Sequence, residues 1–179
     1  MRKILPYCAQ KKFKKILFVG VQRYTEKYSR CFSDSQFVTI DVNPKLARFG
    51  AKLHICDSIL NLARYRESYF PGGLDLILLN GVIGYGLDSS AEIELAFLAM
   101  IDQLNSMGQI VIGVNPQFID EVSLRKIKPV EERLREISFG SAEKRSFRFR
   151  QPLQKNAVHE YFFFAHQSPS KHTYHLGEP

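Results

Sequence analysis

The sequence lacks long apolar runs and paired cysteines, and each absence excludes a class of protein. No apolar stretch approaches the ~20 residues of a membrane-spanning helix. The basic start also lacks the apolar core of a signal peptide. The three cysteines, Cys8, Cys31 and Cys56, are never spaced as a metal or redox pair. We therefore expect a reduced, cytoplasmic protein with no metal and no membrane association.

Positive charge is concentrated at the start of the chain. The formal net charge is +7, and residues 1–15 contribute +6 of it through Arg2, Lys3, Lys11, Lys12, Lys14 and Lys15. Residues 16–119 carry 8 basic and 10 acidic side chains, a net charge of −2. Because nucleic acid is bound by clustered cations, this balance disfavours it as a partner. We expect residues 1–13 to be a solvated basic arm, or else a lid over a site.

Strand-like apolar runs alternate with helix-like segments along most of the 179 residues. The runs cover residues 16–19, 36–40, 52–56, 74–79 and 109–114, and most of their positions are apolar, as in strands covered on both faces. Helical patterns occupy the segments between and after them, which are residues 22–32, 44–50, 58–69, 89–107 and 129–137.

The last third of the sequence changes character. Residues 145–150 and 158–165 read as two strands with no helix between them, so we expect antiparallel pairing. The whole pattern predicts an α/β fold with one doubly wound sheet of about seven strands. The sheet is expected to be mostly parallel, with an antiparallel C-terminal hairpin strand and helices on both faces. Residues 14–166 would form this Rossmann-like domain, and the polar residues 167–179 a loose tail.

Polar residues follow the apolar runs at the edge of the sheet where such folds bind ligands. Asp41 comes 21 residues after Gly20, the spacing typical of a nucleotide-binding turn and its ribose-binding carboxylate. A carboxylate suits this role because it accepts two hydrogen bonds from adjacent hydroxyls. Asp41 could instead only cap the end of its strand.

Two further segments carry candidate site residues. Asp57 and Ser58 follow the third run, where they could contact an adenine or only cap the next helix. The sequence after Asn80 holds Gly81, Gly84 and Gly86, which let the backbone pass close to a ligand. Tyr85 lies among these glycines and could contact a substrate or fold onto the helix that follows.

These segments resemble the class I S-adenosylmethionine-dependent methyltransferases over roughly residues 14–166. The likeness is carried by KKILFVGVQRYTEKY, FVTIDVNP, HICDSI, LDLILLNGVIGYG and LNSMGQIVIGVN, and by the closing strands RSFRFR and VHEYFFFAH. The resemblance implies S-adenosylmethionine as cofactor, Asp41 as ribose-binding acid and Asp57 as adenine-contacting acid. It further implies cofactor contacts from Gly20, Val21, Gln22, Val42, Ser58 and Asn80, and substrate contacts from Gly81, Tyr85 and Asn115.

The first of these motifs departs from the family pattern. Family members usually carry an acid followed by alternating glycines, whereas Phe18 or Val19 stands at the acid position here, and Gln22 and Tyr24 replace glycines. Tyr24 is spaced to share a helical face with residues 28 and 32, so we expect its ring to pack inward. That packing would leave the backbone N–H groups of the turn free for a ligand.

We expect methyl transfer to a small-molecule acceptor by direct in-line displacement, in which positioning supplies most of the acceleration. Family members that methylate base amines or glutamine amides carry Pro-Pro-aromatic after this asparagine or aspartate, whereas Gly81 and Val82 follow Asn80 here. The resemblance therefore disfavours these two kinds of acceptor. No catalytic residue emerges, and His54 and His159 are expected to be structural or solvent-facing.

Three other functions compete with this interpretation. A non-catalytic domain of the same fold could bind a nucleoside or a protein partner. An RNA-modifying enzyme could use the basic arm together with Lys144, Arg145, Arg148 and Arg150. A dinucleotide dehydrogenase is disfavoured, because GVQRYT lacks the glycines that a pyrophosphate requires. The sequence leaves the oligomeric state open.

Overall fold

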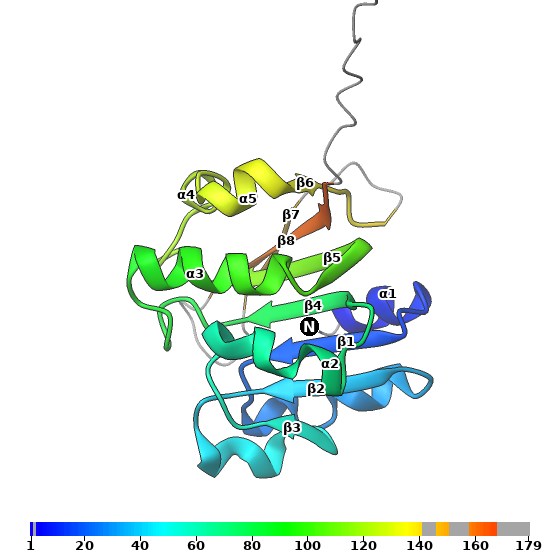
Figure 1. Cartoon of the computed structure of the whole chain (residues 1–179). Coiled ribbons are helices and arrows are strands. Elements are labelled where there is room, and N and C mark those ends of the chain that lie inside the picture. The colour runs from blue at the N-terminus through cyan, green and yellow to red at the C-terminus, as the bar shows by residue number, and fades with distance from the viewer. Residues whose placement is uncertain (2, 141–145, 151–157, 168–179) are drawn as a thin grey trace, which may run out of the picture.

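The computed structural model describes residues 1, 3–140, 146–150 and 158–167. The strands within these residues are β1 (Lys15–Val19), β2 (Gln36–Ile40), β3 (Leu53–Ile55), β4 (Leu74–Asn80), β5 (Leu104–Val114), β6 (Leu134–Glu136), β7 (Ser146–Arg150) and β8 (Val158–His166). They form one eight-stranded sheet in the order β3-β2-β1-β4-β5-β8-β6, with β7 also paired to β8 (Figure 1).

The sheet is parallel apart from one strand. Neighbouring strands from β3 to β5 pair in parallel, whereas β8 runs antiparallel to β5, β6 and β7. β6 and β7 pair with successive parts of the same edge of β8. The expected doubly wound sheet with an antiparallel C-terminal hairpin is confirmed. An additional strand arises because residues 134–136, expected at the end of a helix, form β6.

The helices of the described residues are short. The α-helices are α1 (Ile4–Gln10), α2 (Arg66–Tyr69), α3 (Ser90–Ile101), α4 (Glu121–Arg125) and α5 (Lys128–Arg133). The 3-10 helices are η1 (Arg23–Thr25), η2 (Tyr28–Phe32), η3 (Pro44–Phe49) and η4 (Ile59–Tyr65). Residues 22–32, expected as one helix, therefore contain two separate 3-10 turns.

The longest helix begins as the sequence predicts but ends earlier. The Ser89 side chain accepts a hydrogen bond from the Glu92 amide and the Glu92 carboxylate accepts one from the Ser89 amide, so the two form a capping box. The helix ends at Ile101 instead of near residue 107, and Gly108 lies within β5 rather than past a helix end. A Cβ atom at Gly108 would lie 2.8 Å from the Leu74 carbonyl oxygen, so close strand packing explains this glycine.

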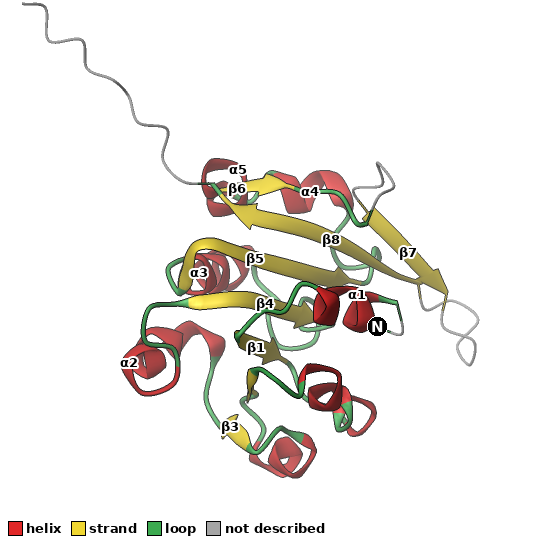
Figure 2. Ribbon diagram, turned by 90° about the vertical axis from the view of Figure 1, so that its right-hand side faces the viewer, coloured by secondary structure: helices red, strands yellow, loops and turns green. Residues whose placement is uncertain are grey.

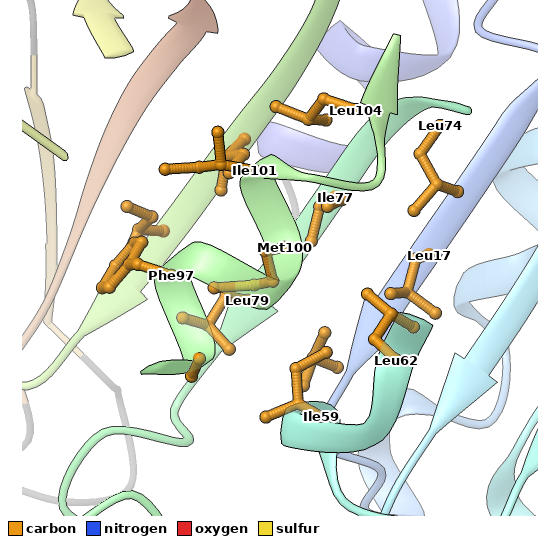
Figure 3. Packing of buried hydrophobic residues seen from close by; sticks show 14 of the residues in the cluster. Leu17, Ile59, Leu62, Leu74, Ile77, Leu79, Phe97, Met100, Ile101 and Leu104 are labelled. Atoms are coloured by element: carbon orange, nitrogen blue, oxygen red, sulfur yellow. The ribbon is translucent and has the colours of Figure 1, made fainter. Parts of the chain in front are cut away.

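Two apolar clusters cover the two faces of the sheet. On one face, β1 and β4 side chains such as Leu17 and Ile77 lie opposite α3 and η4, which contribute Phe97, Met100 and Leu62 (Figure 3). Figure 2 shows α2 and α3 on this side and α1 on the other. Alternate residues of the same strands point to opposite faces, so both clusters draw on each central strand. Together they hold the strand ends in a fixed register.

The segment before β1 belongs to the core. Ile4, Leu5 and Cys8 of α1 are buried in the apolar cluster on the face of the sheet opposite to α3, together with Phe163 of β8. The Tyr7 ring also packs edge-on against the Phe163 ring, with 6.1 Å between their centroids. The expectation of a solvated arm is therefore wrong for residues 4–10, because their apolar side chains face the sheet. None of the described residues of α1 lines the cavity described below, so the structure does not bear out the alternative of a lid either.

Some expectations fall outside the described residues. Residues 168–179 of the expected tail do so, as do Lys144, Arg145 and the side chains of Arg148 and Arg150. In the part of the chain that the structure describes, every helix is too short or too polar to cross a membrane.

Candidate functional site

A cavity of about 440 Å³ lies at the carboxyl ends of β1, β2, β3 and β4. In Figure 1 the arrowheads of β1, β2 and β4 point toward this end of the sheet. The walls come from the strand ends, the turns that follow them, the loop before α3 and the start of β8. The lining residues are Val19, Gly20, Gln22, Tyr24, Ile40, Asp41, Val42, Asp57, Ser58, Ile59, Asn80, Gly81, Val82, Tyr85, Gly86, Leu87 and His159.

Most of the sequence-predicted site residues meet in this cavity. Every predicted cofactor-contacting residue except Val21 lines it, and so do Gly81 and Tyr85 of the predicted substrate contacts. Val21 is fully buried and is not among the residues that line the cavity. Asn115 is also buried outside the cavity, and its side-chain oxygen accepts a hydrogen bond from the Gln117 amide at 3.1 Å. The contacts predicted for Val21 and Asn115 therefore stay predictions that the cavity lining does not support.

Asp41 is held between the ends of two neighbouring strands. The parallel register places Val19 of β1 beside Ile40 of β2, so the residues that follow them are also neighbours. Asp41 Oδ2 accepts a hydrogen bond from the Val21 amide at 2.7 Å, and Oδ1 accepts one from the Asn43 amide at 2.8 Å. An ionised carboxylate offers about four acceptor positions, so Asp41 can still accept hydrogen bonds from a ligand.

Gly20 allows the backbone to turn at the end of β1. Its φ of +86° lies in the left-handed region, which favours glycine. A Cβ atom at this position would lie 2.6 Å from Val82 Cγ2, so a side chain would also collide with the loop after β4. The cavity therefore passes over bare backbone between Asp41 and Asn80.

The first backbone amides of the turn at Gly20 donate hydrogen bonds to acceptors within the protein. The Gly20 amide donates to the Ile40 carbonyl at 3.0 Å, the Val21 amide to Asp41, and the Gln22 amide to Thr25 Oγ1 at 3.0 Å. The expectation of free N–H groups in this turn is therefore wrong for residues 20–22. Tyr24 is 62% exposed and lines the cavity, so the expectation of an inward-packed ring is also wrong. The 3-10 geometry is the cause, because it breaks the four-residue spacing that a continuous helix would give.

Asp57 and Ser58 both cap the following helix. Asp57 Oδ1 accepts hydrogen bonds from the Ser58 amide at 2.7 Å and from Asn61 Nδ2 at 2.9 Å, and Oδ2 accepts one from the Tyr65 hydroxyl at 2.8 Å. These donors stabilise the charged form and lower the pKa of Asp57, with Asn61 having the largest effect. Ser58 Oγ accepts a hydrogen bond from the Leu60 amide. Asp57 and Ser58 therefore cap the helix and line the cavity at the same time.

Asn80, at the end of β4, is oriented by a partner that the sequence did not reveal. The Tyr161 hydroxyl of β8 donates a hydrogen bond to Asn80 Oδ1 at 2.9 Å, and both residues are buried. This bond fixes the orientation of the Asn80 amide, which keeps two N–H donors and a second acceptor position on its oxygen. Burial raises the pKa of Tyr161, which keeps its hydroxyl protonated as a donor.

His159 also lines the cavity, a position that the sequence did not predict. Its Cε1 lies 3.7 Å from the position of a Cβ atom on Gly81. Nδ1 is buried and has no hydrogen-bond partner in the described part of the chain. Burial lowers the pKa of the imidazole. The sequence spacing between His159 and Asn80 hid this proximity, which depends on the pairing of β8 with β5.

The glycine-rich loop after Asn80 is shaped by an aromatic contact. A Cβ atom on Gly84 would lie 2.3 Å from Phe118 Cγ, so the phenyl ring packs against bare backbone. The Tyr85 ring meets the same phenyl ring edge-on, with 5.0 Å between centroids. Gly84 therefore serves this packing, and Gly81, Gly86 and the exposed Tyr85 line the cavity.

Comparison with protein-family models and with curated proteins gives no match. Solved structures do match. The N-methyltransferase NodS from Bradyrhizobium japonicum has a TM-score of 0.66 and 14% identity over 93% of this chain and 97% of that chain. An rRNA methylase from Streptococcus thermophilus has a TM-score of 0.59 and 13% identity over 94% of this chain and 98% of that chain.

A third matching structure, from Burkholderia thailandensis, is 1,6-didemethyltoxoflavin-N1-methyltransferase with bound 1,6-didemethyltoxoflavin and S-adenosylhomocysteine. Its TM-score is 0.61, with 11% identity over 93% of this chain and 80% of that chain. The chain has the class I methyltransferase fold. The methyltransferase fold also explains the single antiparallel strand near the edge of the sheet, as the sequence resemblance implied.

Proposed function

We propose that this protein is an S-adenosylmethionine-dependent methyltransferase that acts on a small-molecule acceptor by direct in-line transfer. The observation that carries the proposal is the position of Asp41 beside Gly20 in one cavity at the carboxyl ends of the parallel strands. In folds of this kind that position suits a ribose. When bound, S-adenosylmethionine supplies a methyl group activated by its sulfonium.

The cavity residues fit a nucleoside cofactor. The free acceptor positions of Asp41 suit two ribose hydroxyls, and Asp57 and Ser58 lie beyond it for the adenine. Val42 and Ile59 add apolar surface for the base. Gly20, Gln22 and Asn80 would surround the rest of the cofactor, and Gly81 and Tyr85 the acceptor.

The dimensions of the cavity support a small acceptor. Its volume of about 440 Å³ falls within the ~300–1,000 Å³ typical of small-molecule sites. The walls around Asn80 are formed by Val82, Tyr85 and Leu87, which are apolar or neutral. The described walls contain no lysine or arginine for the phosphates of a nucleic acid. We also propose a cytoplasmic location, which the three free thiols support.

A non-catalytic nucleoside-binding domain is the second candidate. The internally bonded amides of the turn after Gly20 favour it, because they leave few donors for an elaborate cofactor site. Calorimetric titration with S-adenosylmethionine and S-adenosylhomocysteine tests what the two candidates share. Incubation of cell extract with tritium-labelled S-adenosylmethionine then separates them, and also separates acceptors of different kinds.

The outcomes are distinct. Binding together with label in the small-molecule fraction supports the proposed enzyme. Label in the RNA fraction instead contradicts the small-molecule acceptor, and binding without transfer favours the non-catalytic domain. If neither nucleoside binds, the cofactor assignment is wrong.

A further inference from the structure

Exposed aromatic rings gather at the cavity. Among the tyrosine and phenylalanine side chains whose burial the structure describes, those of Tyr24, Tyr85 and Phe118 are exposed, to 62%, 63% and 50%. Tyr24 and Tyr85 both line the cavity, and the Phe118 ring meets the Tyr85 ring edge-on, with 5.0 Å between centroids. Such a group of exposed rings beside a cavity is typical of a surface that binds a ligand.

The backbone holds Tyr85 in its exposed position. The Tyr85 amide donates a hydrogen bond to the Val82 carbonyl at 3.0 Å, and the Gly84 amide donates one to the Leu87 carbonyl at 3.0 Å. The side chains of Ile83 and Leu87, on either side of Tyr85, are buried in the apolar cluster beneath α3. The Tyr85 ring therefore projects from a loop that is anchored on both sides.

Tyr24 is fixed in a comparable way on the turn after β1. The Thr25 hydroxyl donates a hydrogen bond to the Gln22 carbonyl at 2.8 Å and accepts one from the Gln22 amide at 3.0 Å. Thr25 is itself buried, so the turn is closed on both sides of Tyr24. Partial desolvation raises the pKa of Tyr24, and the nearby Tyr85 hydroxyl adds to this effect. The two phenols therefore lie within electrostatic range of each other.

Two fixed aromatic rings favour a flat, aromatic ligand. A ring that is already held in place loses little conformational entropy when a ligand binds to it. Each stacked or edge-on contact between aromatic rings contributes roughly two- to tenfold in affinity beyond the burial of apolar surface. A saturated ring of the same size can bury apolar surface but has no π-system for these contacts. Asn80 lines the same cavity, and its amide offers N–H donors to a heteroatom of the ligand.

We infer that the acceptor of the proposed methyl transfer is a flat aromatic or heteroaromatic molecule that binds against the rings of Tyr24 and Tyr85. The inference rests on the proposed function, which places the acceptor beside Gly81 and Tyr85, and it adds the chemical class of that acceptor. It predicts that the protein distinguishes an aromatic molecule from its saturated counterpart.

The alcohols 2-naphthol and decahydro-2-naphthol form a matched pair of probes. They share the ring skeleton and the hydroxyl group and differ in aromaticity and planarity. The full chain is first saturated with S-adenosylhomocysteine, so that neither alcohol can occupy the nucleoside site, and is then titrated with each alcohol by NMR. We expect 2-naphthol to bind roughly fivefold more tightly, or better, because it can use the contacts with both rings.

Two variants locate the contacts. Tyr24→Leu and Tyr85→Leu each keep an apolar side chain but remove a ring, and each should weaken 2-naphthol roughly threefold or more while changing decahydro-2-naphthol little. Tyr69→Leu is the control and should bind both alcohols as the wild type does. The Tyr69 carbonyl accepts a hydrogen bond from Gln36 at the start of β2, the opposite end of the sheet from the cavity. Thermal unfolding checks that the variants are folded.

The outcomes separate the inference from the proposed function. If the wild type binds S-adenosylhomocysteine but binds the two alcohols equally well, or binds neither, the inference is overturned and the proposed function stands. A preference for 2-naphthol that survives in both leucine variants also overturns it, because the probe then binds elsewhere. Transfer of label to RNA in cell extract would place an unstacked base against the rings and overturns the free acceptor. If the protein binds neither S-adenosylmethionine nor S-adenosylhomocysteine, the proposed function fails and the inference fails with it. The wild-type comparison decides the inference even where a variant does not fold.

Discussion

Tyr161 and Asn80 are joined by a buried hydrogen bond of 2.9 Å although 81 positions separate them in the sequence. Gly113 of β5 lies between them, and a Cβ atom there would come within 2.5 Å of the Tyr161 ring and 2.6 Å of Asn80 Oδ1. The bond therefore depends on a glycine in the intervening strand. It holds the end of β4, where the cavity begins, against β8.

Replacement of Tyr161 by phenylalanine should lower the free energy of unfolding. Tyr161→Phe leaves Asn80 Oδ1 buried without its donor, which costs about 1–3 kcal/mol. Urea denaturation measures the loss. Tyr24→Phe is the matched control, because Tyr24 is 62% exposed and its change should stay within about 0.5 kcal/mol. Equal stabilities of the two variants would show that the Tyr161 bond contributes nothing.

Asp41→Ala should weaken binding of S-adenosylmethionine by about 1.5–3 kcal/mol, the scale of a hydrogen bond to a charged group. Calorimetric titration measures the change, and thermal unfolding must accompany it, because Asp41 also accepts the Val21 amide. Asp34→Ala, at an exposed carboxylate outside the cavity, is the control and should bind as the wild type does. If the dissociation constant for S-adenosylmethionine is unchanged in Asp41→Ala, Asp41 does not bind the ribose.

The buried face of α1 predicts a large stability effect near the start of the chain. Ile4 is fully buried, so Ile4→Ala removes packed methyl groups and should cost about 2–5 kcal/mol of unfolding free energy. The exposed Gln10 of the same helix provides the control Gln10→Ala, with a change near zero. Chemical denaturation compares the two. If Ile4→Ala unfolds at the same denaturant concentration as the wild type, α1 does not contribute to the core, and the segment is a solvated arm after all.

His54 should make stability fall as the pH is lowered. Burial lowers the pKa of His54, whose Nδ1 lies 2.8 Å from Thr39 Oγ1, whereas an unfolded chain titrates near pH ~6.5. The unfolded state thus binds the proton more readily. The stabilising contribution is present above that value and is lost as the pH falls below it.

The measurement for His54 is the melting temperature near pH ~7.5 and ~5.5. The wild type should lose more on acidification than His54→Gln, which keeps a polar side chain without the titration. All other residues are the same in both proteins, so the difference isolates His54. Identical pH dependences would contradict the prediction.

The sequence by itself determined the elements and the main site positions wherever local chemistry decides them. Continuous apolar runs mark the central strands, because both faces of the sheet are covered. Asp41 and Gly20 could be paired from their spacing, since each directly follows one of two adjacent parallel strands. The capping box of Ser89 and Glu92 likewise needs only residues within one turn.

The tertiary structure alone decided what depends on contacts between distant segments. The apolar face of α1 is visible in the sequence, but the cluster that covers it comes from β1, β4, β5 and β8. Residues 22–32 contain separate 3-10 turns instead of one helix, and Tyr24 lies at the cavity. The Val21 amide donates to Asp41, which is 20 residues away in the sequence. Tyr161 and His159 reach the site through the antiparallel register of β8 with β5. This register joins strands that are far apart in the sequence, so it is settled only when the sheet assembles and buries the apolar face of each strand.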